Sequence, residues 1–317
     1  MTKNRQGRRA PRAAIVGLFA LASTILALSA PSAALAQQKY PTVEAAVDAL
    51  VATAKSGDEK AALVVLGPNG EDIISSGDKV SDDAVRARFV KSYDAKHEIK
   101  TEGDKATLII GENDYPFPIP LVRRAGKWSF DTDAGRIEIL ARRIGHNELD
   151  AIQTALAYVD AQEDYASKDR GAGLGVYAQH FLSEPGKKNG LYWATAQGEE
   201  ESPLGELFAE ATQEGYGGGG GRAPYHGYYY RILTKQGPHA TGGAVDYVVN
   251  GKMIGGFGLV AYPAEYRNSG VVTFIVNHSG QLFQKDLGPD TANIAENIAA
   301  FDPDKSWKKV DTTAPPK

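Results

Sequence analysis

Histidine is the residue type with which a search for catalysis begins, because its side chain changes charge near neutral pH. The chain has six: His97, His146, His180, His226, His239 and His278. No two of them lie three or four residues apart, so no pair of metal ligands is set on one face of a helix. His226 differs from the others because five glycines precede it closely and three tyrosines follow it. It is the one histidine that we consider for a functional role.

Carboxylates gather at Asp131, Asp133 and Glu138, where a predicted strand passes into a long predicted helix. A pair there would suit acid–base catalysis or a divalent cation. Acidic residues also favour the positive N-terminus of a helix, and we prefer that interpretation, with Asp131 or Asp133 as the cap. A later group lacks the regular spacing of a calcium loop, and Asp290 within it has a simpler role as a helix cap. That group is Asp286, Asp290, Asp302 and Asp304.

The remaining motifs argue against an enzyme. Gly217 to Gly221 are followed by Arg222 and Ala223, whereas a phosphate-binding loop requires fixed glycine offsets and a helix directly after it. The run is therefore predicted to be a flexible loop. The chain has no Gly-x-Ser-x-Gly motif and no cysteine, which excludes a thiol nucleophile, a disulfide scaffold and a cysteine-ligated metal centre. We expect no catalytic residue, no metal and no cofactor.

Aromatic residues crowd the C-terminal third of the chain. They are Tyr225, Tyr228, Tyr229, Tyr230, Tyr247, Tyr262 and Tyr266, with Phe257. In a strand, Tyr228 and Tyr230 face one side and Tyr229 the other. One side must pack against a helix, while an exposed side would suit contact with a sugar or a protein, since the tyrosine ring is apolar and its tip polar. As binding residues beside the glycine loop we predict Tyr225, His226, Tyr228, Tyr230 and Arg231.

The first 36 residues have the pattern of a secretory signal peptide. Five basic residues and no acidic ones come before an apolar run from Ala13 to Ala30, and the segment ends in Ala34-Leu35-Ala36. The alternative is a retained membrane anchor, but the run is at the lower edge of spanning length and a small-residue cleavage site follows it. We expect cleavage before Gln37 and export to the periplasm or the outside of the cell.

Removing this segment makes the chain acidic. The full sequence has 35 basic and 39 acidic residues, so loss of the five basic residues leaves 30 against 39, a net charge of −9. Such a protein avoids phosphate backbones, so nucleic acid is not expected as a partner. An envelope protein or a glycan is the expected partner, with no membrane span after signal removal. The oligomeric state is left open.

The order of predicted elements indicates an α+β protein. Helices over 41–66, interrupted at Gly57-Asp58, and from Ser81 onward are followed by strands at 97–100, 106–110, 117–122 and 127–130. Helices before an antiparallel meander describe a small α+β domain over residues 37–132. Its order of elements resembles the cystatin-like and nuclear-transport-factor-2-like (NTF2-like) folds, in which a curved sheet wraps a helix.

Residues 133–167 form the most regular stretch of the chain. Apolar residues from Ile137 to Val159 recur at helical spacing and predict one long helix with an apolar stripe, with Gly145 as the place for a kink. Such a helix is about 50 Å long, more than one small domain needs. We therefore expect it to connect two domains and to pack against a sheet in each.

Residues 168–310 are predicted to be a β-rich C-terminal domain, followed by a tail over 311–317. A short helix over 203–212 precedes strands at 228–233, 244–249, 256–261, 271–276 and 281–284. Asn250-Gly251 and His278-Ser279-Gly280 are typical of hairpin turns. A last helix is expected from Asp290, as cap, through Ala300.

Short motifs in this region carry a resemblance. The helix has Asn147-Glu148, Ala151-Ile152, Ala161-Gln162 and Tyr165-Ala166, and the sheet has residues 227–232, 256–261, 273–277 and 280–283. Over residues 146–285 this combination resembles the soluble domain of type IV pilins and type II secretion pseudopilins. Pilins keep an apolar half on that helix, whereas here the apolar segment lies far upstream. The resemblance therefore implies a pilin-like fold without filament assembly.

A second resemblance covers the whole mature chain. Its motifs are Arg142-Arg143-Ile144-Gly145 before Asn147-Glu148, and the stretch from Asn250 to Phe257. With these the chain resembles more closely a large family of exported bacterial proteins of unassigned function, the domain of unknown function 2950 type.

Together these patterns favour an exported, non-catalytic binding or accessory protein of the bacterial envelope. The first alternative is an envelope hydrolase that uses scattered carboxylates and His226, and the second is a pilin-related assembly subunit. A hydrolase requires a concave pocket where titratable groups converge. A binding protein requires exposed aromatic residues on a surface, and a pilin requires the apolar segment to remain uncleaved.

Overall fold

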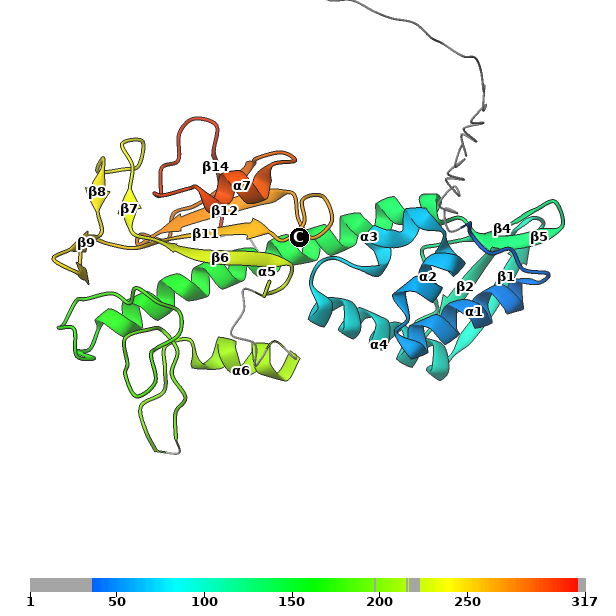
Figure 1. Cartoon of the computed structure of the whole chain (residues 1–317), viewed down its shortest axis with the longest axis horizontal. Helices are drawn as coiled ribbons and strands as arrows, with labels where there is room; N and C mark the ends of the chain where they lie inside the picture. The colour runs from blue at the N-terminus through cyan, green and yellow to red at the C-terminus, as the bar shows by residue number, and fades with distance from the viewer. Residues whose placement is uncertain (1–35, 197, 215, 217–222, 313–317) are drawn as a thin grey trace, which may run out of the picture. The chain divides into compact units, whose positions relative to one another are not determined.

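The computed structural model describes residues 36–196, 198–214, 216 and 223–312 (Figure 1). Three predictions fall wholly or largely outside the described residues: the signal peptide over 1–36, the loop of Gly217 to Gly221 and most of the tail over 311–317. Within the described residues no helix is both long and apolar enough to cross a membrane.

The chain opens with helices whose ends are set by local residues. They are α1 (Val43–Ser56), α2 (Glu59–Leu66), a 3-10 turn η1 (Pro68–Gly70), α3 (Glu71–Ile74) and α4 (Lys79–Ala95). Gly57 has a φ of 68° and ends α1 at the predicted break. The side chain of Asp78 accepts a hydrogen bond from the Ser81 amide, so α4 begins two residues before the predicted start. Helix α3 was not predicted.

The first sheet is antiparallel, in the order β1-β2-β4-β5, with β3 paired to β2. Its strands are β1 (His97–Glu102), β2 (Lys105–Ile110), β3 (Tyr115–Pro116), β4 (Leu121–Arg124) and β5 (Lys127–Phe130). The strand predicted over 117–122 is wrong in position. Pro118 and Pro120 have no amide hydrogen for the ladder, so regular pairing of β4 starts only at Leu121. Apolar side chains of this sheet form one buried cluster with those of α1 and α2.

Helix α5 (Thr132–Ala166) confirms the long helix, 35 residues without interruption, and it passes through Gly145. The predicted apolar stripe is wrong in its first half, where Ile137 is 78% exposed. The helix meets the N-terminal elements mainly through Thr132, Gly135 and Ile139, and from Asn147 onward it buries a regular series of side chains. Most of its burial therefore lies in the C-terminal part.

The two glycines of α5 offer a matched pair for a stability measurement. A Cβ on Gly145 would meet no atom within 4 Å, so Gly145→Ala should raise the free energy of unfolding by up to about 1 kcal/mol through helix propensity. A Cβ on Gly135 would lie 2.7 Å from the carbonyl oxygen of Pro118, and this backbone atom cannot easily move away. Gly135→Ala should therefore lower the free energy of unfolding by about 1–3 kcal/mol. Urea unfolding of both variants gives the two free energies of unfolding. If both change in the same direction, α5 is not packed closely against Pro118.

The C-terminal part is built on a second antiparallel sheet in the order β14-β13-β12-β11-β6. Its strands are β6 (Tyr228–Leu233), β11 (Gly258–Pro263), β12 (Val272–Asn277), β13 (Leu282–Asp286) and β14 (Lys308–Lys309). Two small hairpins flank it, β7 (Lys235–Gln236) with β8 (Val245–Asp246), and β9 (Val248–Val249) with β10 (Lys252–Met253). Helix α6 is Gly205–Glu214 and α7 is Thr291–Glu296. The predicted strand over 244–249 is thus two short strands in different hairpins.

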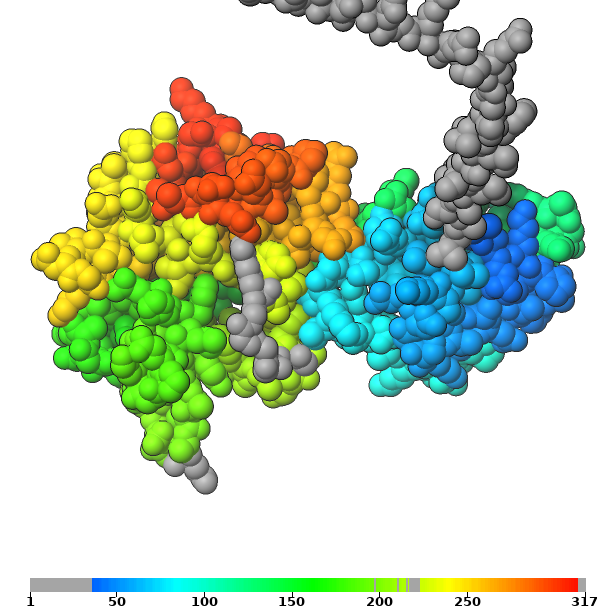
Figure 2. All heavy atoms as spheres, viewed as in Figure 1, coloured from blue at the N-terminus to red at the C-terminus, as the bar shows by residue number. Residues whose placement is uncertain are grey.

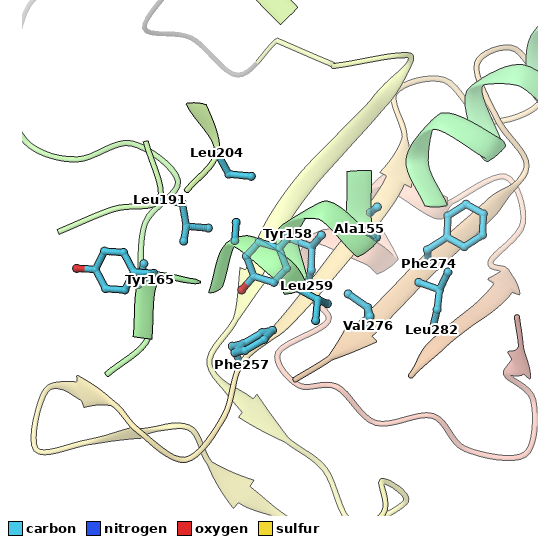
Figure 3. Close-up of a cluster of buried hydrophobic side chains, with 14 of the residues drawn as sticks. Ala155, Tyr158, Tyr165, Leu191, Leu204, Phe257, Leu259, Phe274, Val276 and Leu282 are labelled. Atoms are coloured by element: carbon cyan, nitrogen blue, oxygen red, sulfur yellow. The ribbon is translucent and has the colours of Figure 1, made fainter. Parts of the chain in front are cut away.

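Both faces of this second sheet are covered. One face packs against α5 in a cluster that includes Tyr158, Phe257 and Phe274 (Figure 3). The other face carries a separate cluster beneath α7, with Val260 and Ile275. The last residues of the described chain, orange to red, gather at the top of the C-terminal part in Figure 2. A sheet covered on both faces leaves little room for an exposed aromatic surface.

The last helix is shorter than predicted. It ends at Glu296 instead of Ala300. Phe301 is buried and forms a β-bridge with Gln236, so the chain must leave the helix before it reaches Phe301. Asp290 stands at the N-cap position, but its side chain makes no capping hydrogen bond and accepts one from Asn293 instead.

The described chain is therefore an α+β protein with two five-stranded antiparallel sheets and two small two-stranded ones. The domain limits at residues 132 and 167 stay predictions, as do the finer likenesses to cystatin-like, NTF2-like and pilin-like folds.

Candidate functional site

The structure separates the five predicted binding residues. Tyr228 is fully buried, and its hydroxyl donates to the Val272 carbonyl oxygen at 2.9 Å. Its prediction as a surface contact residue is wrong, because the face that it shares with Tyr230 is the one that packs toward α5. Burial raises the pKa of Tyr228 and of Tyr230 far above the ordinary value for tyrosine. Arg231 donates to the carbonyl oxygens of Ala295 and Ile298 and so holds the end of α7.

Tyr225 and His226 lie together in a tight turn before β6. The backbones of Tyr225 and Tyr228 exchange two hydrogen bonds, which leaves His226 and Gly227 as the central residues. Both have positive φ, 49° and 73°, as a two-residue hairpin turn of this kind requires. The imidazole and the Tyr225 ring are in edge contact, with 4.1 Å between their centres. Both side chains are half-buried.

The imidazole of His226 stands between two carboxylates from different helices. Its Nδ1 lies 3.5 Å from Asp150 Oδ2 on α5, and its Nε2 lies 3.2 Å from Glu214 Oε2 at the end of α6. The Asp150 oxygen is buried, and the Nε2 of His146 also approaches it at 3.4 Å. The His226 side chain is 21% exposed. The cluster therefore brings together polar side chains of α5, α6 and the turn before β6.

A buried carboxylate on the other side of the turn ties three segments together. Asp78 caps α4 through the Ser81 amide, and its Oδ2 accepts from the Tyr216 hydroxyl at 2.7 Å and from the Gly227 amide at 2.9 Å. Burial, together with the hydrogen bond to Asp78, raises the pKa of the Tyr216 hydroxyl far above its ordinary value. This hydroxyl keeps its proton and acts as a hydrogen-bond donor to Asp78.

These contacts limit the chemistry that His226 can perform. A neutral imidazole has one N–H, and a general base must turn its other nitrogen toward a nucleophile or a water molecule. Here each ring nitrogen has a carboxylate neighbour. Among the residues that the structure describes, no group of three or more histidine, aspartate or glutamate side chains is arranged to hold a metal ion. His226, Asp150 and Glu214 form a polar junction between α5, α6 and the turn before β6.

Residues 37–310 match the model of a family described as a protein of unknown function, DUF2950. The chain belongs to the DUF2950 family. The match spans both sheets and α5, and it confirms the resemblance that the motifs around Arg142 and Asn250 carry. No curated protein and no solved structure matches the chain. Nothing in the match bears on the pilin likeness, which stays a prediction.

The other candidate carboxylates of this DUF2950 protein lie apart. Asp131 stands at the N-cap position of α5 without a side-chain cap bond and faces Arg124 at 3.6 Å. Asp133 accepts from the Asn69 amide at 3.0 Å, and Glu138 pairs with Arg142 one turn along the helix. These acids do not converge, so the structure brings no acid–base pair together there. Asp302 pairs with His239, and Asp304 accepts from Ser306.

A second polar junction of the DUF2950 chain was not predicted at all. Arg143 on α5 donates to the carbonyl oxygens of Asp72 and Ile73 and to Asn268 Oδ1. Asn268 in turn donates to the Ser75 carbonyl oxygen at 2.9 Å and to Glu265. Loop 263–270 is thereby fixed to the segment before α4. The partners are far apart in sequence, so no local signal could have found them.

Proposed function

We propose that this protein is exported and acts in the bacterial envelope or outside the cell as a binding or accessory protein, without catalytic chemistry of its own. The observation that supports this best is the environment of His226, whose two ring nitrogens both face carboxylates. We interpret this group of titratable side chains as one that holds α5, α6 and the turn before β6 together. The net charge of −9 after signal removal favours a partner with basic groups.

Tyr225 is the residue through which we expect the partner to be contacted. It is half-buried, its ring is in edge contact with Tyr216 and His226, and the other contact of that imidazole, at 3.2 Å from Nε2, is the carboxylate of Glu214. An aromatic ring next to an acid suits a basic side chain or an amino sugar. Tyr228, Tyr230 and Arg231 then act as support beneath this contact.

A photo-crosslinking residue in place of Tyr225 tests the contact in living cells. The matched control carries the same residue in place of Tyr115, a 39% exposed tyrosine on β3. We expect one discrete adduct from position 225 in the envelope or secreted fraction, absent from position 115. The same pattern from both positions, or none from either, would overturn this contact. The mass of the purified chain, beginning at Gln37, checks export.

The hydrolase using His226 stays a second candidate, since two acids do contact this ring. Turnover of 4-nitrophenyl acetate by the purified protein, lost in His226→Gln while the fold is kept, would support it. We expect no turnover above buffer for either protein. The pilin-related subunit is the third candidate, and a chain that keeps residues 1–36 would support that one.

A further inference from the structure

Helix α4 is unusual in its packing. None of its 17 described residues is buried, although it runs along α1 and the first sheet. Phe89 is half-buried, and Val85 stays half-exposed. A helix of this length normally owes its stability to an apolar face packed into a core. Here that face borders an open space.

The space is a pocket of about 160 Å³ between α4 and the three helices before it. More than half of its lining residues are apolar, and the charged ones are Asp58, Glu59, Asp82, Arg86 and Arg143. The apolar residues lining it are Leu50 and Ala54 of α1, Ala62 and Leu66 of α2, Ile73 and Ile74 of α3, Val85 and Phe89 of α4, and Phe117. Aliphatic and aromatic walls of this kind characterise sites for small molecules.

Three charged residues that line the pocket are already paired within the protein, whereas Asp58 and Glu59 of the same lining are exposed to solvent. Asp82 accepts hydrogen bonds from the backbone and the hydroxyl of Ser76, and burial raises the pKa of its carboxyl group. Arg143 faces Asp82 and donates to carbonyl oxygens and to Asn268. Arg86 pairs with Asp83 at 2.7 Å. An added charge beside Asp82 and Arg143 would find no uncompensated partner there and would lose its hydration.

We propose that this pocket binds a small, uncharged and largely apolar molecule, about the size of one or two fused rings. A cavity of roughly 150 Å³ with Leu, Ile and Phe walls is large enough to hold a benzene ring. A bound molecule completes the core by covering Val85 and Phe89. The proposal rests on the proposed binding function and names the ligand class for a site separate from Tyr225.

The pocket is also held in shape by the rest of the chain. The carbonyl oxygen of Ile73, a wall residue, accepts from Arg143, which is itself bound to Asn268 of loop 263–270. The Ser75 carbonyl, two residues further on, accepts from the same asparagine. The α3 wall is therefore braced by Arg143 and Asn268, which helps to preorganise the site for its ligand.

Binding of 5-fluoroindole to the whole mature protein, followed by fluorine NMR, tests the proposal. We expect saturable binding, and at least tenfold weaker binding in Ala54→Phe, whose ring fills the pocket. Ala141→Phe is the matched control, because Ala141 is an exposed alanine on α5, and it should bind as the wild type does. The charged analogue 5-fluoroindole-2-carboxylate should bind at least tenfold more weakly than 5-fluoroindole.

Three results would overturn the proposal: no saturable binding up to millimolar probe, equal binding by the Ala54 and Ala141 variants, or equal affinity for the carboxylate. If Ala54→Phe does not fold, Ala62→Leu takes its place as a smaller obstruction on the α2 wall. A discrete adduct from Tyr225 without fluoroindole binding rejects the pocket alone. Fluoroindole binding without that adduct rejects the Tyr225 contact and keeps the pocket.

Discussion

Replacing Tyr228 by alanine should lower the free energy of unfolding by about 4 kcal/mol, as expected for truncating a fully buried aromatic residue. The ring packs beside Phe274, with 6.0 Å between the ring centres, and the backbone at Gly270 closes over it. Removing it leaves a cavity between β6, β12 and α5, and it leaves the Val272 carbonyl oxygen without the hydroxyl donor. Urea unfolding followed by circular dichroism gives the value.

Tyr228→Phe is the control for this change. It keeps the ring and removes only the hydroxyl, so about 1 kcal/mol should be lost. If Tyr228→Ala lowers the free energy of unfolding by less than about 1 kcal/mol, the side chain is accessible to solvent. Such a result would agree with the sequence-based prediction that Tyr228 is a contact residue. The comparison thus decides between core and surface for this tyrosine.

Replacing Arg170 by alanine should cost about 2–3 kcal/mol, because it removes a buried cation that donates hydrogen bonds to backbone carbonyl oxygens and packs between two aromatic rings. The side chain is 2% exposed. Its guanidinium lies between the rings of Tyr165 and Trp193, with its central carbon 5.3 and 5.7 Å from their centres. It donates to Glu200 at 2.9 Å and to the backbone at Asp164 at 2.7 Å. The loop after α5 is organised around this one cation.

Lys168→Ala provides the contrast, since Lys168 also pairs with Glu200 but its side chain is 58% exposed. An exposed pair is worth at most about 1 kcal/mol, so the lysine variant should unfold nearly as the wild type does. Equal losses for the two variants would show that charge alone matters and that burial of the guanidinium does not.

The ion cluster around Glu200 should make the fold less stable as the pH falls. The hydrogen bond from Lys188, with help from Lys168 and Arg170, lowers the pKa of Glu200 from 4.5 to about 2. A carboxyl group whose pKa is lowered in the folded state makes its full contribution to stability at any pH above its pKa in the unfolded state. That contribution is lost as pH falls through the range from 4.5 toward 2. Glu200→Gln should flatten the fall in stability over this range.

Much of the fold could be predicted because its signals are local. The break between α1 and α2 follows from Gly57, and the long helix from 35 residues without proline. The tyrosine alternation in β6 was likewise correct, since strand geometry alone sets it. Alternation does not say whether a given face of the sheet is covered by other parts of the chain. Tyr228 was misplaced for this reason, because the second sheet is packed on both faces.

The candidate site could be predicted only in part. His226 was singled out by its neighbours in sequence, and the turn that it forms is a local property of His226-Gly227. Its partners Asp150 and Glu214 come from two separate helices, and nothing near them in sequence relates them to it. The pocket under α4 has no sequence signal at all, because it is the space that remains after four helices have packed.

The sequence by itself determined the α+β class, the order and approximate ends of most helices and strands, and the expectation of export, because these follow from short-range periodicity, caps and composition. Only the tertiary structure decided which tyrosines are core, what His226 contacts and where an apolar molecule fits. Those features depend on side chains brought together from distant segments, whose distances are set by the packing of the whole chain and by no local pattern.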